Sequence, residues 1–251
     1  MKGTEDATTD RSGPVPVVAI SARFVVGVAL IGVALVNIAN GLAVTFRPWE
    51  DSDRVGVETA EWLLLVSENN PSTWLASILL ALGADLSLMV ARVGPRSERI
   101  GWYGVAGFLA LLSLDEAASI HERLGVLFGL DGGGGLTYAW VLPGAALLAV
   151  VMVPFTGFLR RLDATLRRQL VAATAVFLSG GLVVEAIAGW WDEREGSDNI
   201  AYHLISVVEE NLELLGAVLW IAALLGYLVR EIVSVELQFR SQGVDVDQPS
   251  G

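Results

Sequence analysis

The chain has 251 residues, 53% of them hydrophobic, and a formal net charge of −12. This composition is too apolar for an ordinary soluble domain, and the acidic balance leaves no footprint for binding a nucleic acid. Cysteine is absent, which excludes disulfides, thiolate metal sites and cysteine nucleophiles. The only lysine is Lys2, which excludes lysine-based covalent chemistry inside a membrane.

Several apolar runs approach or exceed the ~20 residues that cross a bilayer. We therefore predict an all-α polytopic membrane protein, a bundle of six transmembrane helices. Residues 1–16 are expected to be a disordered tail without the basic start of a secretory signal, residues 17–230 to be the transmembrane domain, and residues 231–251 to be a polar tail. The six helices are predicted over residues 17–45, 71–93, 101–130, 138–159, 170–191 and 200–229.

The first two helices carry polar residues with local meanings. Asn37 and Asn40 are one turn apart in the first helix, and we interpret both as interhelical hydrogen-bonding groups. Asn70-Pro71 predicts an N-cap followed by proline at the first position of the second helix. Glu68 stands just before it, either as a ligand at the outer rim or as an acid favoured by the helix start.

The third helix is defined less clearly, because its uncharged part, Gly101–Leu114, has only 14 residues. No helix breaker follows in 115–123, and 124–130 is apolar again, so we predict one unbroken helix over 101–130 with polar groups inside it. Glu116 is expected to point away from the other polar groups of this helix. Those others share an arc of roughly 160°: Asp115, Ser119, His121 and Glu122.

The last three helices differ in their polar content. The fourth is free of charge, with Pro143 and Pro154 expected to kink it or fray its ends. The fifth carries Glu185 and a Gly180-Gly181 pair that permits close packing. The sixth is apolar except for one stripe, about 120° wide, of ionisable and hydroxyl side chains. These are His203, Ser206, Glu209, Glu210 and Glu213.

The distribution of arginine and lysine predicts the orientation, because cytoplasmic loops are enriched in both. They concentrate before the first helix, between the second and third, between the fourth and fifth, and after the sixth. Both termini are therefore expected in the cytoplasm. Tryptophans at the opposite helix ends fit an interfacial belt there: Trp49, Trp74, Trp140, Trp190 and Trp191.

This orientation predicts that the buried ionisable groups meet in one layer. At ~1.5 Å per residue from the cytoplasmic helix ends, Asp115, Glu185 and Glu213 come out roughly 21–24 Å deep. His121, Glu122 and Glu210 come out at roughly 29–32 Å, still in the outer half of the membrane. Each charged side chain at a helix centre costs on the order of 2.5–3.5 kcal/mol. A group of this many acids must therefore be protonated, hydrated or bound to cations.

Two imidazoles among these acids favour a divalent transition metal, either one ion or a pair bridged by Glu. Ligation by carboxylate and imidazole without sulfur suits Fe, Mn or Zn. The expected ligands are His121, Glu122, His203, Glu210 and Glu213, with Glu185 and Asp115 bridging or supporting them. Around them we expect Glu68, Glu209, Ser206 and Ser119.

Two stretches carry a resemblance to other proteins. Ser113–Glu122, with its Asp-Glu and His-Glu pairs, and the later Glu209-Glu210-x-x-Glu213 resemble a group of uncharacterised bacterial multi-pass membrane proteins. The resemblance covers roughly residues 68–213. It implies a bacterial inner membrane, and it implies no activity. The orientation predicted from arginine and lysine makes the site face the extracytoplasmic side.

Three functions stay open on this basis. The first is a metal-dependent membrane enzyme, a hydrolase or an oxidoreductase, that acts on a lipid-like or apolar substrate. The alternative is a proton- or cation-coupled transporter that uses the same acids as a relay. The third is a purely structural network of protonated acids. Membrane lipid is the expected partner, and an apolar bundle is compatible with a homodimer, although no motif demands one.

Overall fold

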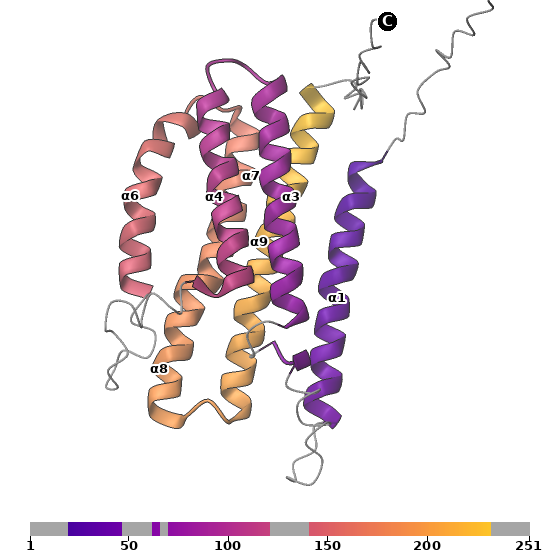
Figure 1. Ribbon diagram of the computed structural model, residues 1–251, viewed down its shortest axis with the longest axis vertical. Helices are drawn as coiled ribbons and strands as arrows, with labels where there is room; N and C mark the ends of the chain where they lie inside the picture. The colour runs from indigo at the N-terminus through magenta and orange to yellow at the C-terminus, as the bar shows by residue number, and fades with distance from the viewer. Residues whose placement is uncertain (1–19, 47–61, 66–69, 121–140, 232–251) are drawn as a thin grey trace, which may run out of the picture.

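The computed structural model describes residues 20–46, 62–65, 70–120 and 141–231. Over these ranges the protein is helical and contains no strand. The main elements are α1 (Ala22–Phe46), α3 (Pro71–Val93), α4 (Arg99–Ala118), α6 (Val141–Leu159), α7 (Ala164–Leu178), the π-helical turn η1 (Ser179–Val184), α8 (Glu185–Glu195) and α9 (Ile200–Glu231). Successive rods run in opposite directions, and α7, η1 and α8 form one rod (Figure 1).

Four of these rods are long and apolar enough to cross a membrane, judged by length and composition within the described ranges. They are Ala22–Thr45, Pro71–Val93, Ala164–Glu195 and Ile200–Arg230. The expectation of an all-α membrane protein is supported by these four. The helices α4 and α6 lie beside them in the bundle (Figure 1).

The starts of α3 and α7 follow from their capping residues. The side chain of Asn70 accepts a hydrogen bond from the backbone N–H of Thr73 over 2.9 Å, with Pro71 at the first helical position, as the sequence predicts. Asp163 caps α7 by accepting from the N–H groups of Thr165 and Leu166. The fifth helix therefore begins at Ala164, earlier than the expected residue 170.

The expected unbroken helix over 101–130 is interrupted. Helix α4 ends at Ala118, because Ser119 adopts a left-handed backbone conformation, with φ 45° and ψ 51°. A left-handed residue stops the α-helical ladder, and serine is an uncommon residue there. No sequence signal marked this position. Residues 121–130 of the expected helix lie outside the described part of the chain.

The apolar core fills one half of the bundle. Its fully buried large side chains come from α3, α4, α7 and α9: Val90, Trp102, Leu166, Leu170, Leu214, Ile221 and Leu224. On α9 this core reaches Leu214, and the next residue towards the N-terminal end of that helix is Glu213. The transition from apolar to acidic side chains on α9 is thus immediate.

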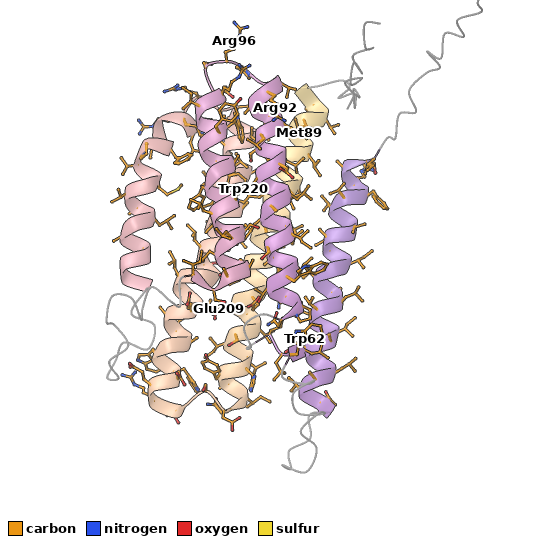
Figure 2. The ribbon with its side chains drawn as sticks, viewed as in Figure 1. Trp62, Met89, Arg92, Arg96, Glu209 and Trp220 are labelled. Carbon is orange, nitrogen blue, oxygen red and sulfur yellow. The ribbon has the colours of Figure 1, made fainter. Side chains whose placement is uncertain are left out.

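The two ends of the bundle differ in charge. One end, here called the arginine end, carries Arg92, Arg96, Arg99, Arg160, Arg161 and Arg230 at the helix termini that meet there. Two of these arginines hold the connecting turns. The Arg99 side chain donates to the carbonyl of Ala91 over 3.0 Å, and Arg161 donates to that of Ser97 over 3.3 Å. Figure 2 shows Arg92 and Arg96 at this end, far from Glu209.

Candidate functional site

The candidate site is built around the π-helical turn η1. The rod of α7 and α8 would be a plain α-helix without it, and π-turns inside α-helices frequently occur at functional sites. At its end, the backbone N–H of Glu185 donates to the carbonyl of Gly180, five residues earlier. The turn begins Ser179-Gly180-Gly181, so two successive residues have no Cβ.

These two glycines let α9 approach very closely. A Cβ added to Gly180 would lie 2.8 Å from Cγ of Glu213 and 2.7 Å from the backbone oxygen of Glu209. A Cβ added to Gly181 would overlap Oε1 of Glu213. The carboxylate of Glu213 therefore occupies the space that side chains of η1 would otherwise fill.

Glu213 is the centre of a carboxylate cluster. It interacts electrostatically with four other acids, which lie on α4, α8 and α9: Glu116, Glu185, Glu209 and Glu210. Glu185 is only 7% exposed. Electrostatic interaction with Glu213 thus links five acids, and Glu213 itself directly precedes the core residue Leu214 on α9. We call these five residues the carboxylate cluster.

Helix α3 contributes a hydroxyl to this cluster. Ser72 is 1% exposed, and its hydroxyl donates to Oε2 of Glu210 over 2.8 Å. Ser72 lies in the first turn of α3, so α3 begins at the level of Glu210. The sequence analysis did not single out Ser72. Its signal was a small hydroxyl residue next to a predicted helix start at the outer end of a span.

Helix α1 joins the bundle beside the same stretch of α9. The side-chain amides of Asn37 and Asn211 bond each other, which bears out the expected interhelical role of Asn37. Asn40 bonds outside the helices instead, since its side-chain oxygen accepts from the backbone N–H of Leu65. Asn211 directly follows Glu210 on α9, so α1 packs against the segment that carries the cluster.

The remaining expected site residues divide into three groups. Ser119 and Ser206 are buried, at 5% and 6% exposure. Asp115 and His203 each have interaction partners, but neither is among the residues that act electrostatically on Glu213. The other expected residues, Glu68, His121 and Glu122, lie outside the described part of the chain.

Glu116 acts on the cluster from α4. We expected its side chain to point away from most polar groups of the third helix and to belong to a different contact. Glu116 is among the acids that act on Glu213, whereas its neighbour Asp115 is not, and this is compatible with that expectation. Residues 121 and 122 lie outside the described part of the chain, so the arc itself stays a prediction.

The described residues contain no group of three or more His, Asp or Glu side chains arranged to hold a metal ion. The metal hypothesis also uses His121 and Glu122, which lie outside the described part of the chain. It therefore stays a prediction. At this level of the bundle the described residues provide acids, hydroxyl groups and the backbone of the glycine pair Gly180-Gly181.

Comparison with known proteins places the chain in a family. No curated protein and no solved structure matches it. One family model does match, over residues 22–226, and this range contains all the described helices except the last turn of α9. The chain therefore belongs to the family described as a domain of unknown function (DUF8692).

Proposed function

We propose that this protein takes up protons or cations at the carboxylate cluster and couples that uptake to transport across a bacterial inner membrane. In this proposal six helices span the membrane, both termini lie in the cytoplasm with the arginine end, and the cluster opens to the extracytoplasmic side. The arginines at the helix ends support this orientation. The large exposed apolar side chains of α1, such as Phe24 and Ile31, then contact membrane lipid.

The feature that carries the proposal is the group of four carboxylates that act electrostatically on Glu213, whose own side chain lies against Gly180 and Gly181. Like charges at close range repel strongly where water is scarce, so five anions cannot stay together without compensation. Among the described residues, the arginines of α3, α4, α7 and α9 lie at the other end of the bundle. Uptake of protons or cations lowers the repulsion within a group of acids, and this is the function that the cluster supports.

The test is proton flux in liposomes that contain the full-length protein and a pH-sensitive dye. We expect a pH gradient to drive flux through the wild type, and we expect Glu213→Gln to reduce it at least tenfold. The matched control is Asp85→Asn, which changes an exposed acid of α3 away from the cluster and should keep the flux. Absence of flux and of proton uptake in the wild type, with protons, Na⁺ and K⁺ each tried, would overturn the proposal.

A metal-dependent membrane enzyme acting on a lipid-like substrate is the second candidate. The observation that favours it is the end of α4 at Ser119, three residues after Glu116, which acts on Glu213, and two residues before His121 in the sequence. The test is elemental analysis of purified protein beside His203→Ala and Glu210→Ala. One or two equivalents of Fe, Mn or Zn, lost in both variants, would favour the enzyme over the transporter. The mass of the same detergent-solubilised protein tests the predicted homodimer.

A further inference from the structure

The buried stripe of the α7–α8 rod shifts by one residue at η1. Along α7 the buried positions are Leu166, Leu170 and Ala173, and the stripe continues through Phe177, which packs on Gly216, to the buried Gly180. A regular α-helix would carry this stripe on to residues 184, 187 and 188, at 3.6 residues per turn.

Beyond η1 the buried positions are different. Glu185 is 7% exposed and Ala188 is 1% exposed, whereas Ile187 is 47% exposed. Gly189 is buried as well. The stripe has therefore moved by one position, from 184, 187 and 188 to 185, 188 and 189. A π-turn inserts one residue into an α-helix, so η1 accounts for the shift. Glu185 faces the bundle because of this inserted residue.

If the same segment were a regular α-helix, different residues would face the bundle. One residue corresponds to a rotation of about 100° around the helix axis. Val184 would then face Glu213, and Glu185 would turn away from the carboxylate cluster. The inserted residue would pass to the helix end at Gly196, whose φ of 74° already breaks the helix.

Two features make this exchange accessible. Glycine is a poor helix former, and Gly180 and Gly181 stand together in the turn. The π form is itself rare because its hydrogen bonding is less favourable than that of an α-helix. Against this, the glycines accommodate Glu213 closely, so the contact with α9 holds the π form in place.

We propose that the segment Ser179–Val184 is a register switch of the carboxylate cluster, which assembles the cluster as a π-turn and withdraws Glu185 from it as an α-helix. The switch regulates the site described above, and to that extent it rests on the proposed function. It assigns to the glycine pair a role in controlling the number of acids that face Glu213.

One deletion and one insertion lock the two registers. Deleting Val183, an exposed residue of the turn, removes the inserted residue and leaves Glu185 and Ala188 facing the bundle in a regular α-helix. Inserting one alanine after Val183 instead moves Val184 and Ile187 to the inward positions and turns Glu185 away. A deletion inside a transmembrane helix is normally damaging, so its tolerance here is a specific expectation.

The register is read with a nitroxide spin label on Ile187→Cys, measured by its accessibility to oxygen dissolved in the lipid. The natural chain has no cysteine, so the label reacts at one site only. We expect an accessible label in the deletion variant, a protected label in the insertion variant, and both components in the full-length parent chain. A label at Val171→Cys, exposed on α7, should be the same in all three and reports correct folding.

Proton uptake in liposomes completes the test. We expect the deletion variant to keep the uptake of the parent chain and the insertion variant to lose at least nine-tenths of it. The proposal is overturned if the insertion leaves the Ile187 label accessible, if the deletion abolishes uptake in a folded protein, or if the parent chain shows the accessible component alone. If no chain takes up protons, the proposed function fails, while the labels still decide whether the register changes.

Discussion

The side-chain amides of Asn37 on α1 and Asn211 on α9 each donate a hydrogen bond to the other, over 2.8 and 2.9 Å. Each amide also donates to a carbonyl four residues earlier in its own helix, at Val33 and Val207. Both donors of each amide are therefore used. This reciprocal pair joins α1, which has many exposed apolar side chains, to the stretch of α9 that carries the carboxylate cluster.

The first prediction concerns this amide pair. Replacing either Asn37 or Asn211 by alanine leaves the remaining amide without its partner in an apolar setting. We expect a coupling free energy of about 0.6 kcal/mol, and at most about 1.7 kcal/mol, between the two positions, as for other polar pairs in membrane helices. A double-mutant cycle measured by reversible unfolding in mixed micelles gives this value. Strictly additive effects of the two substitutions would contradict the pairing.

The second prediction concerns the hydroxyl of Ser72. Ser72→Ala removes the donor to Glu210 in a site that is 1% exposed, and we expect a loss of about 1–3 kcal/mol of unfolding free energy. Ser87→Ala is the matched control on the same helix. Ser87 is also fully buried, but its hydroxyl donates only to the backbone oxygen of Gly83 within α3. Equal losses in the two variants, measured by unfolding, would show that the contact with Glu210 contributes nothing.

Much of this arrangement follows from the sequence. The apolar runs predict the helices, and Asn70-Pro71 marks the start of α3 to the residue. Counting the rise along oppositely directed helices predicts that Glu185 and Glu213 lie at one level, because helix geometry is nearly constant. These features depend on local propensity and on regular spacing, both of which can be read without knowing the neighbours.

Two departures from regular geometry could not be predicted. Gly180-Gly181 indicated close packing, but one glycine pair does not distinguish an α-helix from a π-turn, and the choice depends on contact with Glu213. Ser119 has no residue signal for a left-handed conformation. One irregular residue changes which side chains share a face, so the arc expected over residues 115–122 does not follow from regular spacing beyond Ser119.

The third prediction concerns acid sensitivity at the arginine end. The backbone N–H of Leu166 holds the pKa of Asp163 below its usual value, with weaker contributions from the N–H groups of Thr165 and Ala164 and from the charge of Arg230. A depressed folded-state pKa stabilises the fold above the unfolded value, about 3.9. This stabilisation is lost as the pH falls through the folded-state pKa.

Thermal unfolding from about pH 6 down to about pH 3 measures this effect, because the range crosses the ordinary pKa of aspartate. We expect Asp163→Asn to keep the cap and to lose part of the acid dependence of the melting temperature. Asp163→Ala should lower the melting temperature throughout the range, since it removes the cap itself. An Asp163→Asn variant with the same pH dependence as the wild type would refute the assignment.

The fourth prediction concerns the closest approach of α7 to α9. A Cβ on Gly216 would lie 2.6 Å from the backbone nitrogen of Phe177, and backbone cannot yield as a flexible side chain can. We therefore expect Gly216→Ala to cost about 1–3 kcal/mol of unfolding free energy, as overpacking does. Gly226→Ala is the control on the same helix, where nothing lies within 4 Å of the added Cβ. There the better helix propensity of alanine should stabilise the protein by up to about 1 kcal/mol. Opposite signs for the two substitutions, measured side by side, are the expected result, and destabilisation by both would mean that glycine is required along α9 for a reason other than the contact with α7.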